Sequence, residues 1–312
     1  MALRLVAAAH SDPGLQREQN EDASHIQMGD DPTRATGLFI VADGMGGYHA
    51  GEVASQLAVE TIRDDLQALL GPTANQPTVR LGKRKKSKEA KESKAAKNGD
   101  AKAAAQDGDT PEDEKASTIQ GGAPTQLLAE SVAMEQYGER LREAVEHSSE
   151  VIYKYGRDHR DANGLGSTVT AALVVDGQAY IANVGDSRTY LLHDGALKPI
   201  TRDHSLVARL VEAGQIEADE VYDHPNRNLV YRSLGAGSAD VEVDLFTVQL
   251  QAGDMLVLCC DGLWEMVHDP EMQSVLTSER DPEKAAKQLV DHANVNGGED
   301  NITVVLVRCE DA

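Results

Sequence analysis

The sequence predicts an α+β fold in which antiparallel sheets are flanked by helices. Two observations support this class. Strand-like segments follow one another through Asp-Gly turns at 176–177 and 194–195, as in hairpins. Longer segments with apolar residues at helical spacing come in pairs between these groups of strands. Regular alternation of single strands and helices, which would predict a parallel sheet, is not seen.

The N-terminal third supplies two strands and a helix. A first strand is expected over residues 3–9, followed by a polar loop and by the apolar run LFIVAD at 38–43. Residues 52 to about 70 are expected to form a helix, because Val53, Leu57, Ile62, Leu66, Leu69 and Leu70 recur at helical spacing.

The composition changes over residues 72–126, where Pro, Gly, Lys, Ala and Asp dominate. Between Arg80 and Lys102 there are ten Lys or Arg residues and three acidic ones. Such a segment cannot bury enough apolar surface to offset its ordering entropy, so we predict a disordered insertion within a single domain of residues 1–312. Two roles stay open for it, a solubilising linker or recruitment to nucleic acid or another anionic partner.

After the insertion, a second helix is expected over about 127–155. Three strands follow at 167–176, 178–185 and 188–194. We then expect a helix at 205–213, strands at 241–248 and 254–260, a helix at 282–296 and a last strand at 302–308.

Composition excludes several functions. The net charge of −22 disfavours binding to nucleic acid or anionic membranes outside a local basic patch such as the insertion. No segment approaches the ~18 apolar residues of a membrane span, and the N-terminal run LVAAA is read as a strand and not as a signal, so a cytoplasmic protein is expected. The three cysteines are expected to be small core residues.

Four acidic residues stand at the ends of apolar runs beside glycines. Two open Asp-Gly pairs, Asp43 and Asp261, and two follow glycine-containing turns, Asp186 and Asp300. A single Asp-Gly pair is most often only a turn. Several carboxylates delivered to strand ends would repel one another unless a cation lay between them, and oxygen ligands favour Mg²⁺ or Mn²⁺ over Zn²⁺.

A further polar motif, REQNED, occupies residues 17–22. By itself it is a polar loop. However, an arginine close to two acids can bind a phosphate through its planar fork of donors while the acids hold a metal ion or its waters.

Seven motifs occur in one order along the chain: RxxNED at 17–22, VADGMGGxxxGE at 41–52, GLGSTVTA at 164–171, ANVGDSRTYLL at 182–192, TRDHS at 201–205, LCCDGLWE at 258–265 and EDNITVVLV at 299–307. Together they closely resemble the bacterial subtype of the metal-dependent protein phosphatases of type 2C. The resemblance covers nearly all of the chain except the insertion. It implies a central sandwich of two antiparallel sheets with pairs of helices outside.

The resemblance also implies a centre of two Mn²⁺ or Mg²⁺ ions, with a third site. Asp43 would bridge the two ions, the Gly44 carbonyl would bind one of them, and Asp261 and Asp300 would complete the shell of that ion. Asp22, with Glu21, would hold the second ion, and the third site would use Asp186 and Asp261. Arg17 would bind the substrate phosphate.

The implied reaction is hydrolysis of phosphoserine and phosphothreonine by a water that the metals acidify, opposing a Ser/Thr kinase, without a covalent enzyme intermediate. The leaving-group acid stays open between His49 and a metal-bound water. Residues 205–232 would form a flap that influences substrate choice, or a plain surface helix and loop. The expected partners are phosphorylated proteins, no membrane partner is expected, and the enzyme is expected to be a monomer. An inactive scaffold is disfavoured because the acidic positions are intact.

Overall fold

The computed structural model describes residues 3–30, 34–47, 50–71, 124–159, 162 and 164–312. The chain divides into a compact unit of residues 1–72 and 130–312 and a separate unit of residues 73–129. The predicted insertion therefore lies largely outside the described residues.

Two five-stranded sheets, antiparallel at every described pairing, form the centre of the unit of residues 1–72 and 130–312. In the first sheet the spatial order is β1 (Leu3–Asp12), β12 (Ile302–Asp311), β11 (Met255–Cys259), β8 (Arg188–His193) and β9 (Ala196–Pro199). In the second it is β10 (Asp244–Gln249), β7 (Gln178–Val184), β6 (Val169–Val175), β3 (Gly37–Ala42) and β2 (Ala23–Met28).

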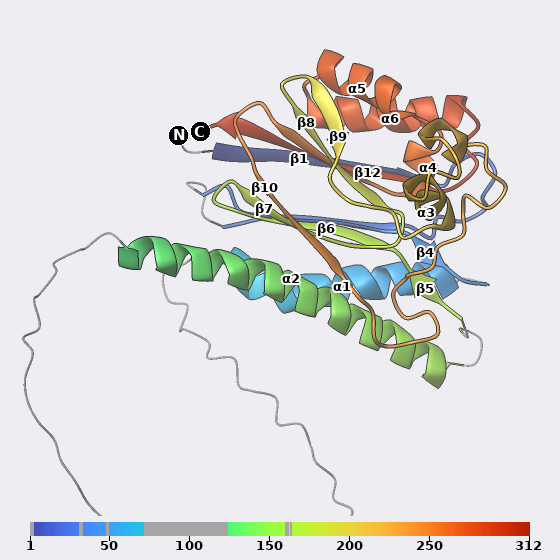
Figure 1. The fold of residues 1–312 in the computed structure, drawn as a ribbon, viewed down its shortest axis with the longest axis horizontal. Helices are drawn as coiled ribbons and strands as arrows, with labels where there is room; N and C mark the ends of the chain where they lie inside the picture. Colours follow the sequence, from blue (N-terminus) through green and yellow to red (C-terminus); the bar gives the residue numbers. More distant parts are fainter. Residues whose placement is uncertain (1–2, 31–33, 48–49, 72–123, 160–161, 163) are drawn as a thin grey trace, which may run out of the picture. The chain divides into compact units, whose positions relative to one another are not determined.

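The sheets pack face to face, and helices cover their outer faces (Figure 1). The helix α1 (Ala50–Leu70) and the described part of α2 (Pro124–Asp158) lie on the second sheet, whereas α5 (Asp269–Ser278) and α6 (Pro282–Val295) lie on the first. The predicted α-β-β-α sandwich is thus confirmed.

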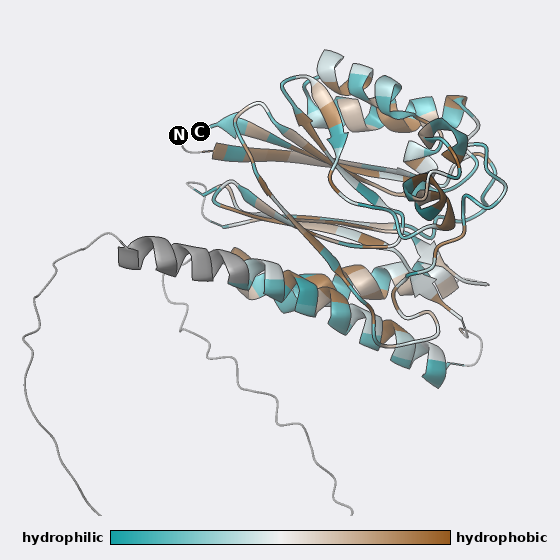
Figure 2. Ribbon diagram, viewed as in Figure 1, coloured by the Kyte–Doolittle hydropathy of each residue, from teal (hydrophilic) through white to brown (hydrophobic). Residues whose placement is uncertain are grey.

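Strand β3 shows why its sequence is a continuous apolar run. Leu38 and Ile40 pack with the helices α1 and α2, while Phe39 and Val41 pack with the opposite sheet. A strand buried on both faces has no polar side to alternate with. Figure 2 shows the corresponding pattern, with apolar residues along the strands and polar ones on the outer helix faces.

The two predicted Asp-Gly hairpins are also present. Asp176 and Gly177 have φ values of 51° and 82°, and Asp194 and Gly195 have values of 49° and 79°. Positive φ at both central residues is what a two-residue turn with the right-handed strand twist requires. The turns join β6 to β7 and β8 to β9.

Several elements were not predicted. Strand β2 is polar and half-buried at the sheet edge, so it has no apolar run. Strand β9 is also a short edge strand without an apolar run, and only the turn at 194–195 indicated it. Helix α5 buries only Met272, Val275 and Leu276. Helix α2 begins at Pro124, earlier than the expected start at about 127. Among the described residues, no helix combines the length and apolar character needed to cross a bilayer.

Candidate active site

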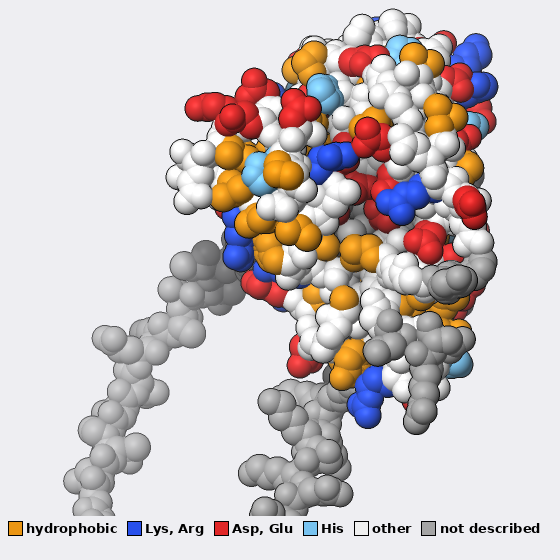
Figure 3. All heavy atoms as spheres, turned by 90° about the vertical axis from the view of Figure 1, so that its right-hand side faces the viewer, with side chains coloured by type: hydrophobic (Ala, Val, Ile, Leu, Met, Phe, Trp, Pro, Cys, Tyr) orange, Lys and Arg blue, Asp and Glu red, His pale blue; other side chains and the backbone are white. Residues whose placement is uncertain are grey.

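A pocket of about 200 Å³ opens at one end of the sandwich. Seven of the sequence-predicted residues line it: Arg17, Glu21, Asp43, Gly44, Asp186, Asp261 and Asp300. Their segments meet here because β3, β7 and β11 end at this edge while β12 begins there. Figure 3 shows acidic side chains gathered in a hollow on this face, with basic side chains beside them.

Asp43 directly follows β3, and its backbone is fixed on both sides. The amide of Thr168 donates to the Asp43 carbonyl at 2.9 Å, and the Ser167 hydroxyl donates to the same oxygen at 2.9 Å. Desolvation is the largest cause that raises the pKa of the Asp43 carboxyl well above its ordinary value, and the charge of Asp261 comes next. The side chain still borders the pocket, so a cation entering it could reach this carboxylate.

Asp261 starts the short helix α4 (Asp261–Trp264), directly beyond β11. Its Oδ1 is buried without a hydrogen-bond partner. Burial raises the pKa of Asp261 to about 6, helped by the charge of Asp300 and opposed by a hydrogen bond with Asp43. This carboxylate therefore lies next to two others with one oxygen unused.

Asp300 uses both of its oxygens within the protein. Oδ2 accepts from the Arg17 guanidinium at 2.6 Å, and Oδ1 accepts from the amide of Asn301 at 2.8 Å. The Arg17 side chain is 52% exposed. The largest single effect on its pKa is burial, which lowers it. The charges of Asp300, Asp261 and Asp43 together outweigh burial, so the pKa of Arg17 is raised. Arg17 is thus a fixed positive charge at the edge of an acidic pocket.

Glu21 and the Gly44 carbonyl approach each other through a glycine. A Cβ on Gly51 would lie 2.6 Å from Glu21 Oε2 and 2.7 Å from the Gly44 carbonyl oxygen. A Cβ on Gly44 would lie 2.1 Å from the Gly51 carbonyl oxygen. A side chain at Gly51 would displace Glu21 Oε2 and the Gly44 carbonyl oxygen, and one at Gly44 would collide with the Gly51 carbonyl. The contacts therefore group the Gly44 carbonyl with Glu21.

Asp22 lies deeper than the pocket wall. Neither of its carboxylate oxygens has a hydrogen-bond partner of good geometry, although both are shielded from solvent. Desolvation raises the pKa of Asp22 to about 7, and the nearby Thr303 hydroxyl and Cys260 thiol oppose this rise. A buried carboxylate without a strong partner is costly unless it is protonated or bound to a cation.

Asp186 follows β7 and is almost fully buried. Desolvation is the main cause that raises its pKa well above the ordinary value, and the charges of Asp261 and Asp203 add to it. The indole N–H of Trp264 donates to the Asp186 carbonyl at 3.0 Å. The guanidinium of Arg188 lies over the Trp264 ring, 3.5 Å from the ring centroid, and Arg188 donates to Asp203 at 2.7 Å. The sequence analysis did not predict that Trp264, Arg188 and Asp203 would position Asp186.

Asn301 is a second residue that the sequence reasoning missed. Its side-chain amide donates to the carbonyls of Pro13 and Gln19 at 3.0 and 2.8 Å, and its Oδ1 accepts from the amide of Glu21 at 2.8 Å. It therefore fixes the N-terminal loop that carries Arg17, Glu21 and Asp22. Its place directly after Asp300 in the EDNIT motif was the only signal in the sequence.

The segment predicted as a flap contains α3 (Leu206–Glu212) and the short 3₁₀ helix η3 (Ala218–Val221), and Asn228 and Val230 line the pocket. Arg227 connects it to the core, donating to Glu265 at 3.0 Å and to Glu299 at 2.7 Å. Burial raises the pKa of Glu265 to about 7. His204 is buried and accepts from the Gly185 amide at 3.0 Å.

Two features that the sequence predicts are not found among the described residues. His49 lies outside the described residues. Among the residues that are described, no three His, Cys, Asp or Glu side chains already form a closed set of metal ligands. The observation that favours a cation is instead the set of buried carboxylate oxygens without partners, on Asp22 and Asp261.

Comparisons with known proteins identify the family. The family model for protein phosphatase 2C matches residues 15–292. The chain belongs to the protein phosphatase 2C family. The serine/threonine phosphatase Stp of Listeria monocytogenes is 34% identical over 301 residues, which cover 96% of this chain and 94% of the relative.

Solved structures agree with this family. The Mycobacterium tuberculosis phosphatase PstP is similar with a TM-score of 0.68 and 31% identity, covering 100% of both chains. The catalytic domain of PstP in complex with 2 manganese ions has a TM-score of 0.67 and 30% identity, with coverage of 99% of this chain and 100% of the other. The resemblance to bacterial members is thus confirmed, and the chain is a metal-dependent serine/threonine protein phosphatase.

Proposed function

We propose that this phosphatase hydrolyses phosphoserine and phosphothreonine at the pocket lined by Asp43, Asp261 and Asp300, opposing a Ser/Thr kinase. The observation that carries this assignment is the convergence of buried carboxylates with the half-exposed Arg17 in one small pocket. The similar PstP catalytic domain, whose structure is in complex with two manganese ions, supports binding of divalent metal by this chain.

The donor set fits divalent cations that prefer oxygen. Asp43 and Asp261 contact each other, Asp261 and Asp22 offer unpartnered oxygens, and Glu21 lies close to the Gly44 carbonyl. Hard ligands of this kind suit Mn²⁺ or Mg²⁺. We propose that Asp43, Asp261 and Asp300 would hold one ion and that Asp43, Glu21 and the Gly44 carbonyl would hold the other, to which Asp22 would also contribute. A third ion would use Asp186 and Asp261.

This arrangement differs in one respect from the ligand division that the sequence resemblance implies. There, the Gly44 carbonyl shares an ion with Asp261 and Asp300. Both the Gly44 carbonyl oxygen and Glu21 Oε2 lie within 2.7 Å of the position that a Cβ on Gly51 would take, which supports our proposal that these two oxygens act together.

Each group of the chain has a distinct task. When bound, the two ions would supply an acidified water and neutralise phosphate charge. Arg17 would bind the phosphoryl oxygens through its fork of donors and orient the phosphorus. The flap residues Asn228 and Val230 would contact the substrate side chain or its neighbours, since they border the same pocket. Asn301 would hold the loop that carries Arg17 and Glu21 at a fixed position relative to Asp300.

The test is hydrolysis of an aryl phosphate and of a phosphothreonine peptide by the purified chain. Activity is expected with Mn²⁺ or Mg²⁺ and is expected to disappear in EDTA and return when the metal is restored. Full turnover in the chelator would show that the carboxylates do not act through a metal. Phosphoproteomics with active and inactive enzyme would then identify the opposing kinase through its substrates.

A further inference from the structure

A second cavity, of about 350 Å³, lies away from the catalytic pocket and shares no lining residue with it. Its walls come from the β8–β9 turn, the β10–β11 turn, the end of α5 and the late part of β12. Strand β11 begins at this cavity with Met255 and leads to Asp261 at the catalytic end, so the two sites lie at opposite ends of the same strand.

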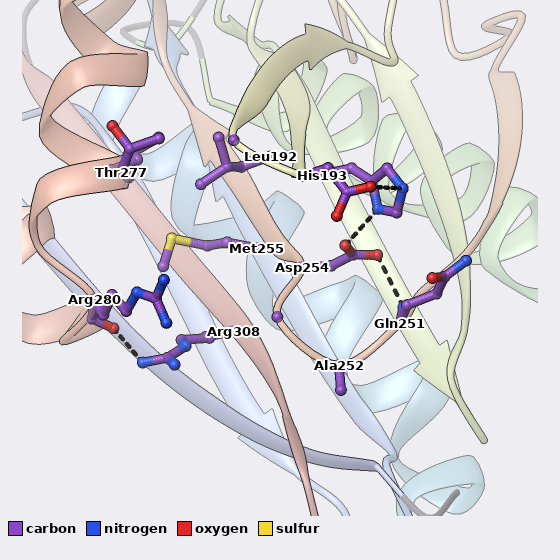
Figure 4. Close-up of a pocket in the computed structure, with 13 residues that line it drawn as sticks. Leu192, His193, Gln251, Ala252, Asp254, Met255, Thr277, Arg280 and Arg308 are labelled. Atoms are coloured by element: carbon purple, nitrogen blue, oxygen red, sulfur yellow. Dashed lines mark hydrogen bonds and ion pairs between the residues drawn. The ribbon is translucent and has the colours of Figure 1, made fainter.

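Two arginines border this cavity. Arg280 is exposed, and its guanidinium makes no hydrogen bond or ion pair to any other described residue. The Arg308 guanidinium donates from Nη1 to the backbone carbonyl of Arg280 at 2.7 Å and lies 3.6 Å from Glu310. The bond holds Arg308 beside the segment that carries Arg280 (Figure 4).

The acidic residues of the cavity are engaged elsewhere. Asp254 is 4% exposed, its Oδ1 bonds to His193 Nδ1 at 2.7 Å, and its Oδ2 accepts from the Gln251 amide at 2.8 Å. The bond to Asp254 also raises the pKa of His193. Asp194 is 93% exposed, with its carboxylate 3.5 Å from His193 Nε2. Neither acid forms an ion pair with an arginine, although the chain has a net charge of −22 and acids far outnumber arginines.

Between the basic and the histidine walls the lining is apolar. The side chains of Leu192, Met255 and Leu276 are buried and lie among the residues that border the cavity. Figure 4 shows Leu192 and Met255 between the arginines and His193. The cavity therefore combines a pair of cationic donors with a surface that can accept an apolar group.

We propose that this distal cavity binds a phosphate monoester, with its phosphoryl group on Arg280 and Arg308 and its organic part on Leu192, Met255 and Leu276. Two guanidiniums that border one cavity match a phosphate dianion better than a singly charged carboxylate, because each supplies a full positive charge and a fork of donors. The carboxylates among the described residues that line the cavity, Asp194 and Asp254, lie against His193 and not against the arginines, so the ligand is bound and not hydrolysed. A small phosphorylated metabolite and a second phosphorylated side chain of a protein substrate share this chemistry.

The test uses the Mg²⁺-loaded full chain with methionine methyl groups labelled with ¹³C. Met255 lines the distal cavity and Met45 lines the catalytic pocket, so their signals report the two sites separately. The signals are assigned with Met255→Leu and Met45→Leu. The probes are phenylphosphonate, inorganic phosphate and a peptide with phosphonomethylalanine, a phosphoserine analogue that is not hydrolysed.

We expect phenylphosphonate to shift the Met255 signal in a saturable manner and Arg280→Gln to weaken this binding at least tenfold. The matched control is Arg63→Gln, at a half-buried arginine of helix α1 that does not line the cavity, and it should leave the affinity unchanged. Phenylphosphonate should bind several-fold more tightly than phosphate at Met255. Tighter binding by the peptide would identify a protein ligand, and tighter binding by phenylphosphonate a small molecule.

The proposal is overturned if only Met45 responds, or if Arg280→Gln binds as tightly as the wild type. Equal affinity for phosphate and phenylphosphonate would overturn the assignment of the apolar wall. None of these results depends on turnover, so the outcome is independent of the catalytic assignment.

Discussion

Removing the guanidinium of Arg17 tests the substrate-binding role directly. In the structure Arg17 donates to Asp300 at 2.6 Å, but the two side chains are 52% and 28% exposed. An ion pair so open to solvent contributes about 0–1 kcal/mol to stability. Arg17→Ala should therefore lower the melting temperature by no more than about 2–4 °C.

The effect on catalysis should be much larger. A charge-assisted hydrogen bond to a phosphoryl oxygen is worth about 1.5–3 kcal/mol. Its loss corresponds to a decrease of about 10- to 150-fold in kcat/KM, since each 1.4 kcal/mol is a factor of about ten. Arg17→Lys keeps the charge and loses the fork, so it should fall between the wild type and Arg17→Ala.

The assay is initial-rate hydrolysis of an aryl phosphate at several Mn²⁺ concentrations, with calorimetry for metal affinity. Arg4→Ala is the matched control, because Arg4 is 62% exposed and is ion-paired with Glu310 on the same strand that follows Asp300. It should retain wild-type kinetics. A kcat/KM for Arg17→Ala within twofold of the wild type, or an equal loss in Arg4→Ala, would refute the reasoning. Loss of metal affinity with unchanged KM would instead assign Arg17 to metal binding.

Three other outcomes are expected. Asp43→Asn and Asp261→Asn should each remove most turnover and weaken metal binding in calorimetry while the fold persists. The control Asp64→Asn, on the exposed face of α1, should have neither effect. Near-normal activity in either site variant would mean that the assignment of the metal ligands is wrong. Gly51→Ala should reduce metal affinity, because its Cβ would lie 2.6 Å from Glu21 Oε2. The control Gly138→Ala meets only ordinary contacts at 3.6 Å or more, so it should be neutral or slightly stabilising. Equal metal affinity in the two variants would contradict the pairing of Glu21 with the Gly44 carbonyl. In EDTA, thermal stability should fall as the pH rises from about 5 to 8. Folding raises the pKa of Asp22 to about 7 and that of Asp261 to about 6, so the folded state binds more protons than the unfolded state in this range. The stability is therefore present at low pH and is lost as these groups ionise. Mg²⁺ should restore more stability at pH 8 than at pH 6, and Asp22→Asn should flatten the dependence of stability on pH. A stability of the wild-type chain in EDTA that does not change with pH would show that these carboxylates are well solvated.

Sequence patterns predicted the main elements because they reflect local chemistry. Asp176-Gly177 predicted a hairpin since both residues adopt positive φ at low cost, and the apolar runs of β3 and β11 predicted buried strands. Strand β2 and helix α5 escaped prediction because their apolar content is low and they are held by neighbours in the sheet and by α6. The acidic residues were chosen for their places at strand ends, and the order of the motifs identified the family.

What the sequence by itself determined is the set of chemical groups: the carboxylates, the arginine beside them, the fold class and the family. The tertiary structure decided the individual contacts that these groups make. The grouping of Glu21 with the Gly44 carbonyl, the anchoring of the N-terminal loop by Asn301, the stacking of Arg188 on Trp264 and the two arginines of the distal cavity all join segments far apart in the chain. Such contacts depend on how two sheets pack and where their strands end, and no local pattern of residues encodes that distance or direction.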